Sequence, residues 1–271
     1  MSKPPKTLRV PDLQAKKARC EKITMLTAYS SWMARLLADS HVIDMLLVGD
    51  SLGMVELGHD STLPVTMEDM VRYTRAVRTG APDALIVADM PFLSHQLSPA
   101  QSLRNAGRLV QEAGATAVKI EGGASIASTV ERLVSAGIPV MGHLGLTPQS
   151  IHVLGGFRRQ AKNPDEQQRL LSDAAALESA GAFSLVLECV PAELGREASR
   201  QLRMPVIGIG SGVDCDGQVL VINDILGLSG FAPAFAKQYA SVGDAISQAV
   251  RCFAGEVRSG QFPPPAPGKQ E

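Results

Sequence analysis

The sequence has few aromatic residues, no large excess of charge of either sign and no close pair of cysteines. Aromatic residues make up 4% of the 271 positions, and the formal net charge is -1. Basic residues are not interleaved with aromatic ones, so the chain lacks the pattern typical of proteins that bind nucleic acid or an anionic membrane surface. These absences favour a small molecule as the partner.

Cysteine spacing and the lack of long apolar runs indicate the cellular compartment in which the protein is expected. Cys20, Cys189, Cys215 and Cys252 include no CxxC pair, so neither a zinc site nor a disulfide framework is indicated. The basic N-terminal stretch is followed by no apolar segment of the kind found in secretory signals. No run approaches the roughly 18 apolar residues of a membrane span. We therefore expect a cytoplasmic protein with buried, reduced thiols.

Short apolar runs, bounded by glycine, proline and polar residues, alternate with amphipathic stretches along the chain. Near-continuous apolar runs are typical of parallel strands buried on both faces, and roughly 250 residues suit a single α/β barrel. The pattern therefore predicts an α/β fold, a single (β/α)8 TIM barrel, with a doubly wound sheet as the alternative. The predicted strands are Ile23 to Tyr29, Met45 to Val48, Ala84 to Ala88, Ala117 to Ile120, Ile138 to Met141, Ser184 to Leu187, Pro205 to Ile209 and Val219 to Ile222.

The chain divides into three regions in this interpretation. Residues 1–20 form an N-terminal extension and residues 21–259 form the barrel, which is the catalytic domain. Residues 260–271 contain several prolines and are expected to be a disordered tail, because such a composition cannot bury enough apolar surface to fold.

Ionisable residues follow five of the predicted strands. They are Asp50, Asp89, Glu121, His143 and Glu188. In a barrel, catalytic groups lie at the C-terminal ends of the strands, so these side chains would share one mouth. Crowded carboxylates repel one another unless they are protonated or bridged by a cation, and oxygen ligands favour magnesium. The alternative, a helix-capping role for each acid, accounts for Asp50 or Asp89 singly but not for the whole set.

The roles of Lys119 and His143 stay open at this point. Lys119 and Glu121 lie two apart on one strand and face the same space, either to meet a ligand or to pair with each other. Gly122 and Gly123 leave room for close approach to the backbone. His143 is a metal ligand, a proton carrier or a structural residue, and we favour the last two because the acids already supply hard ligands.

Seven segments between about Leu8 and Phe262 match the sequence motifs of one known family. They are Met25 to Tyr29, Gly49 to Met54, Gly58 to Thr66, Val118 to Gly123, Gly142 to Ser150, Leu187 to Pro191 and Ile207 to Gly210. Because they occur together and in order, they form a specific signature. The chain resembles the ketopantoate hydroxymethyltransferase family.

This resemblance implies a (β/α)8 barrel, dependence on magnesium, a cytoplasmic location and a homo-oligomer, which in the family is a decamer. It also implies a step of pantothenate biosynthesis. A hydroxymethyl group from 5,10-methylenetetrahydrofolate and water is added to 3-methyl-2-oxobutanoate, and 2-dehydropantoate is formed. The oxo acid would chelate magnesium through its carboxylate and keto oxygens, and the ion would stabilise the enolate that forms when the C3 proton leaves.

The resemblance also assigns roles to individual residues. Magnesium would be bound, directly or through water, by Asp50, Asp89 and Glu121. The oxo acid would be held by Asp50, Ser51, Asp89 and Lys119. Glu188 would be the proton acceptor.

The sequence departs from the family motifs at two places. Ser30 replaces an expected aspartate, and because both cap helices we expect a structural effect only. The loop 157–162 differs from the usual family sequence, so the residues that contact the folate stay open.

Another magnesium-dependent oxo-acid lyase or mutase of the same barrel superfamily is the nearest alternative function. A barrel that only senses small molecules is the other, but all five strand-end groups are present.

Overall fold

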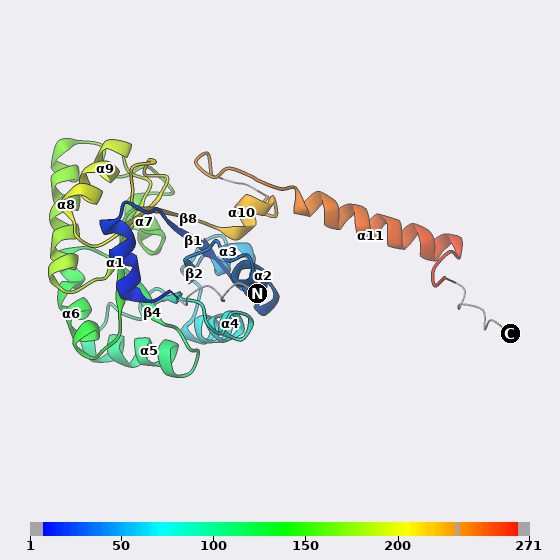
Figure 1. Cartoon of the computed structure of the whole chain (residues 1–271), viewed down its shortest axis with the longest axis horizontal. Coiled ribbons are helices and arrows are strands. Elements are labelled where there is room, and N and C mark those ends of the chain that lie inside the picture. The colour runs from blue at the N-terminus through cyan, green and yellow to red at the C-terminus, as the bar shows by residue number, and fades with distance from the viewer. Residues whose placement is uncertain (1–7, 231–232, 265–271) are drawn as a thin grey trace. The chain divides into compact units, whose positions relative to one another are not determined.

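The computed structural model describes residues 8–230 and 233–264, and its central feature is a closed barrel of eight parallel strands (Figure 1). The strands pair in chain order, and β1 pairs with β8 to close the barrel. This confirms the predicted (β/α)8 barrel and excludes the doubly wound sheet, which has open edges. The strands are β1 (Ile23–Thr27), β2 (Met45–Val48), β3 (Ile86–Asp89), β4 (Ala117–Glu121), β5 (Val140–Gly145), β6 (Ser184–Glu188), β7 (Val206–Ile209) and β8 (Gly217–Leu220).

Helices follow each strand except β7, which leads directly to β8, and the helices before residue 222 lie around the barrel (Figure 1). Several of the helices begin at a side-chain cap. Thr66 and Asp69 form a reciprocal capping box, and the side chains of Ser98 and Asn163 accept hydrogen bonds from the backbone at the third position of their helices. The helices are α1 (Val10–Ala18), α2 (Ser31–Asp39), α3 (Leu52–Val55), α4 (Met67–Gly80), α5 (Pro99–Gln111), η1 (Ala124–Ile126), α6 (Ala127–Ser135), η2 (Pro148–Ser150), α7 (Ile151–Leu154), α8 (Pro164–Ser179), α9 (Ala192–Gln201), α10 (Ile222–Leu226) and α11 (Val242–Ser259).

The chain clusters into two compact units, residues 1–221 and 222–271. The first contains the eight strands, and the second contains α10 and α11. The predicted N-terminal extension includes α1, while its first seven residues and residues 265–271 of the predicted tail lie outside the described residues. Across residues 8–230 and 233–264, no helix combines the length and the apolarity that crossing a bilayer requires.

Apolar side chains fill the barrel interior and make a rigid floor for the mouth. Met25, Met45, Val87 and Met141 point inward from different strands and are almost fully buried. Leu13 of α1 joins this cluster with 0% exposure. Burial of such side chains is the main favourable term in folding, so the strand ends above this core are held in fixed positions.

Strand register places the polar strand ends beside one another. Asp89 is the register partner of Lys119 across β3 and β4, and Glu121 is the register partner of His143 across β4 and β5. Glu188 ends β6 opposite Gly145 of β5. The closed barrel therefore brings together residues that are far apart in the sequence.

Candidate active site at the C-terminal mouth of the barrel

The predicted ionisable residues lie together at the C-terminal mouth, and most of them are buried. Exposure is 4% for Asp50, 2% for Asp89, 6% for Glu121 and 3% for His143. Glu188 is less buried, with 15% of its side chain exposed. Since charged groups are costly to bury without partners, their contacts decide what this mouth can do.

Lys119 pairs with Asp89 and not with its neighbour on the same strand, Glu121. Its Nζ lies 3.1 Å from Asp89 Oδ1, and both side chains are almost fully buried. Burial lowers the pKa of Lys119, but Asp89, Glu121 and Asp50 outweigh burial and raise it. Lys119 is therefore a buried ammonium. Of the two arrangements that the sequence allowed, the simple pairing of Lys119 with Glu121 is not formed.

His143 connects Lys119 with two glutamates. Lys119 Nζ is 3.1 Å from His143 Nδ1, and His143 Nε2 is 3.1 Å from Glu188 Oε2. Glu121 Oε1 lies 3.4 Å from Nδ1. Both ring nitrogens therefore face other ionisable side chains. Burial and Lys119 lower the pKa of His143, but its contacts with Glu121 and Glu188 outweigh them and raise it.

The pKa values of the mouth follow from burial and crowding. Burial and then the charges of Asp89 and Glu121 raise the pKa of Asp50 well above its usual value. Burial also raises the pKa of Asp89, although Lys119 opposes the shift. Burial raises the pKa of Glu121 too, but His143 and Lys119 outweigh burial and lower it. Lys119 therefore does not fully compensate the three acids, as expected from their crowding.

The acids suit a hard divalent cation that keeps water. Asp89 Oδ1 and Glu121 Oε1 are buried and accept no hydrogen bond in the described chain, although Lys119 and His143 lie close to them. Among residues 8–230 and 233–264, no group of three or more His, Cys, Asp and Glu side chains is arranged to hold a metal ion by itself. Magnesium commonly uses one or two carboxylates and completes its shell with water and substrate oxygens, so the residues fit this ion.

Two uncharged side chains at the mouth, those of Gln149 and His95, were not predicted from the sequence. Gln149 donates from Nε2 to Asp50 Oδ2 at 2.8 Å, and its backbone N–H donates to Glu121 Oε2 at 3.0 Å. His95 Nε2 lies 3.1 Å from the carbonyl oxygen of Glu121. The one available signal for Gln149 was its place in the family-like segment Gly142 to Ser150.

Two nearby predictions concern Ser30 and Gly123. Ser30 caps α2, because its hydroxyl accepts a hydrogen bond from Met33 N at 3.3 Å, and this confirms the structural role. The room at Gly123 is taken by a side chain: a Cβ there would overlap the carboxylate of Asp173, which accepts a hydrogen bond from Ala124 N at 2.8 Å. A group therefore does approach the backbone closely at this glycine, as expected, and it is a side chain of α8.

The altered loop 157–162 is tied to the end of β6. Gln160 N donates to the carbonyl oxygen of Cys189 at 2.8 Å, and Arg159 donates to that of Val190 at 3.4 Å. Burial and Glu188 raise the pKa of Cys189 to about 11. A thiol reacts as its thiolate, so the raised pKa makes Cys189 a poor nucleophile.

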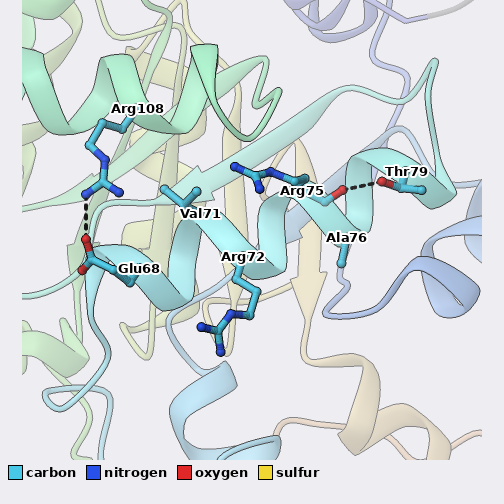
Figure 2. A pocket seen from close by; sticks show the side chains of 7 residues that line it. All are labelled: Glu68, Val71, Arg72, Arg75, Ala76, Thr79 and Arg108. Atoms are coloured by element: carbon cyan, nitrogen blue, oxygen red, sulfur yellow. Dashed lines mark hydrogen bonds and ion pairs between the residues drawn. The ribbon is translucent and has the colours of Figure 1, made fainter.

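A surface groove of about 460 Å³ lies on the outside of the barrel between α4 and α5 (Figure 2). Its charged lining is partly neutralised, because Arg108 Nη1 lies 2.9 Å from Glu68 Oε1. None of Asp50, Asp89, Glu121 and Glu188 lines this groove. The groove is separate from the mouth.

The fold and the mouth define a (β/α)8-barrel protein with a buried ring of carboxylates. Similar folds include 2,3-dimethylmalate lyase, a member of the PEP mutase/isocitrate lyase superfamily (TM-score 0.61, 13% identity, 96% of this chain and 88% of that chain). Phosphonopyruvate hydrolase, solved with oxalate and Mg++, is another (TM-score 0.61, 14% identity, 97% and 93% covered). At such low identity the likeness shows a shared fold alone.

Sequence comparison is more specific. The family model described as ketopantoate hydroxymethyltransferase matches residues 7–265. The relative from Moorella thermoacetica named 3-methyl-2-oxobutanoate hydroxymethyltransferase is 56% identical over 255 residues, which cover 94% of each chain. The relative of the same name from Syntrophus aciditrophicus is 56% identical over 252 residues, which cover 93% of this chain and 92% of that one. This chain belongs to the ketopantoate hydroxymethyltransferase family.

Proposed function

We propose that this chain is a 3-methyl-2-oxobutanoate hydroxymethyltransferase, which adds a hydroxymethyl group from 5,10-methylenetetrahydrofolate and water to 3-methyl-2-oxobutanoate. The product is 2-dehydropantoate, for pantothenate biosynthesis. Membership of the family supports the activity. The observation that carries the chemistry is the buried Asp89–Lys119 pair with Asp50 and Glu121 beside it, because this arrangement offers one cation and several hard oxygens to a small oxo acid.

The proposed magnesium site uses the acids of β2, β3 and β4. Asp50, Asp89 and Glu121 would hold the ion directly or through water. When bound, magnesium supplies Lewis-acid stabilisation of negative charge on the keto oxygen of the substrate. The substrate carboxylate would then lie between this site and the ammonium group of Lys119.

Lys119 and Ser51 are proposed to hold the oxo acid. A lysine ammonium has three donors, and two of them face Asp89 and His143. The third would meet the substrate carboxylate. The hydroxyl groups of Ser51 and Tyr29 lie 2.8 Å apart, which fixes the position of the serine beside Asp50.

Glu188 is proposed to take the proton from C3 of the oxo acid. The C3–H electrons then form the C2–C3 double bond of the enolate, and negative charge moves to the keto oxygen. His143 Nε2, 3.1 Å from Glu188 Oε2, orients the carboxylate. Greater exposure of Glu188 than of the other acids suits a group at the rim that faces the substrate.

Product formation tests this function against a lyase or mutase. The protein is incubated with magnesium and 3-methyl-2-oxobutanoate, with and without 5,10-methylenetetrahydrofolate, and the oxo acids are separated by mass spectrometry. We expect 2-dehydropantoate only when the folate is present. Cleavage or rearrangement of an oxo acid without the folate would instead assign the chain to the other activity.

A cytoplasmic homo-oligomer, a decamer as the family resemblance implies, is part of the same proposal. Four large apolar side chains of α11 support association because they are exposed and recur at helical spacing. They are Ile246, Val250, Phe253 and Val257. An apolar stripe of this kind is typical of a helix that packs against another surface.

A further inference from the structure

Gln149 lies between the acids of the mouth and joins the ends of several strands. It is in η2, which follows β5, and it is 5% exposed. Its side-chain nitrogen donates to Asp50 Oδ2 at 2.8 Å and to the carbonyl oxygen of Met90 at 2.9 Å. Its backbone N–H donates to Glu121 Oε2 at 3.0 Å. One uncharged residue therefore contacts the segments that end β2, β3 and β4.

The orientation of the Gln149 amide is fixed by its partners. A carbonyl oxygen only accepts hydrogen bonds, so the amide nitrogen must face Met90 and cannot exchange places with Oε1. Gln96 Nε2 donates to Gln149 Oε1 at 3.3 Å. Both N–H groups and the oxygen of the amide are thus engaged. Because unpaired buried polar groups are costly, the amide keeps this orientation.

The same contacts restrict two carboxylates. Asp50 Oδ2 is held by the Gln149 side chain and Glu121 Oε2 by its backbone N–H. The second oxygen of each carboxylate is then the one that a cation would contact. Glu121 Oε1 is also one of the buried oxygens that accept no hydrogen bond in the described chain.

We propose that Gln149 is a positioning residue that orients Asp50 and Glu121 for a divalent cation. This inference rests on the proposed function, since it concerns the same metal site. Hydrogen-bond partners of metal ligands are typically worth about 10- to 100-fold in metal affinity. Gln149 fits such a role because its amide donates to a carboxylate without adding a negative charge to a mouth that already has three acids.

Manganese binding to the metal-free protein tests the role without relying on activity. Mn²⁺ is titrated into the protein, and free Mn²⁺ is measured by electron paramagnetic resonance. Gln149→Met has nearly the shape of glutamine but removes the side-chain donor, and it leaves the backbone N–H on Glu121. We expect affinity to fall by roughly 10-fold or more. The thermal midpoint of the metal-free variant shows whether it folds.

Two matched variants separate positioning from a general effect on the mouth. Asn105→Leu removes another partly buried amide, whose Nδ2 donates to the carbonyl oxygen of Ser94 at 2.7 Å in the loop after β3. It contacts no carboxylate of the site in the described chain, so its Mn²⁺ affinity should equal that of the parent protein. Gln96→Met removes the donor to Gln149 Oε1, and its affinity should lie between those of the parent and Gln149→Met.

The outcomes distinguish this inference from the proposed function. Parental affinity in a folded Gln149→Met variant overturns the role of Gln149 and leaves the metal site intact. An equal loss in Asn105→Leu overturns it as well, because the effect would then be structural. If Gln149→Met does not fold, parental affinity in Gln96→Met overturns the role. If the parent protein binds no Mn²⁺, or binds it equally after Asp50→Ala, the proposed metal site itself fails.

Discussion

Asp89 and Lys119 form a buried ion pair across the register of β3 and β4, with Asp89 Oδ1 and Lys119 Nζ 3.1 Å apart. Asp89 Oδ2 also accepts a hydrogen bond from Asp50 N at 3.0 Å. The pair therefore ties the ends of three adjacent strands to one another. Lys119 is at once the positive charge that permits the acids to stay buried and the proposed anchor of the substrate.

Replacing Lys119 with methionine should destabilise the protein strongly. Removing one partner of a buried pair leaves an uncompensated charge and typically costs about 3–5 kcal/mol. Arg19→Met is the matched control, because Arg19 pairs with Glu21 at 2.7 Å and the two side chains are 57% and 50% exposed. An exposed pair contributes little to stability, because water screens its charges. Urea unfolding of both variants without metal measures the difference, and equal losses would contradict the account.

The stability of the metal-free protein should fall as the pH rises above about 4, the ordinary pKa of an aspartate. Burial and neighbouring acids raise the folded-state pKa of Asp50, so its favourable contribution is complete below the unfolded pKa and is lost as the pH passes the folded one. Glu121 has a lowered pKa and acts in the opposite sense, at lower pH. Thermal midpoints between pH 5 and pH 8, roughly the range over which proteins are most stable, should decline.

Asp50→Asn and added magnesium are the controls for this pH dependence. The variant has no carboxylate to ionise at position 50, so its decline should be shallower than that of the parent. Magnesium offsets the charge of the acids, so it should raise the midpoint more at the upper end of the range. A parent protein whose midpoint rises over this range would show that the acids are not held as described.

Alanine at two glycines should have opposite effects on stability. A Cβ at Gly123 would overlap the Asp173 carboxylate, and overpacking typically costs about 1–3 kcal/mol. Gly107 lies inside α5, and a Cβ there would meet nothing within 4 Å. Gly107→Ala should therefore stabilise the protein by about 0.5–1 kcal/mol. Urea unfolding checks both signs, and a neutral Gly123→Ala would contradict the packing role of Asp173.

Charge placed on the apolar stripe of α11 should reduce the size of the oligomer. Val250 and Phe253 are 60% and 55% exposed in one chain, so a charged residue would be tolerated there unless another subunit covers them. We expect Val250→Asp and Phe253→Asp to give smaller species by native mass spectrometry. Gln248→Asp, on the same helix, should keep the parental size. Parental assemblies in all three variants would place the contact elsewhere.

Most of the candidate site could be predicted because parallel strands have a regular consequence. The apolar runs gave the approximate positions of the strands, and closure of the barrel then places Asp50, Asp89, Glu121 and Glu188 at one mouth. Predicted boundaries shifted by a few residues, as at β8, which begins at Gly217. The predicted domain boundaries, with the barrel at residues 21–259, stay a prediction.

The missed features depend on contacts between segments. Lys119 was considered as a partner of Glu121, two residues away, but the cross-strand register gives it to Asp89. Gln149 is an uncharged residue in a loop, and its type does not reveal that its amide contacts Asp50. A glycine such as Gly123 likewise does not indicate whether a ligand or a side chain occupies the space beside it.

Exchange of the C3 hydrogen of 3-methyl-2-oxobutanoate with solvent tests the central claim most directly. Proton NMR in D2O with magnesium, and without folate, follows the loss of the C3 signal. The parent protein should exchange this hydrogen, and Glu188→Gln should still bind the oxo acid but exchange it about 10²- to 10⁴-fold more slowly, since that is the usual contribution of a general base. Parental exchange in Glu188→Gln, or no exchange in the parent protein, would contradict the account.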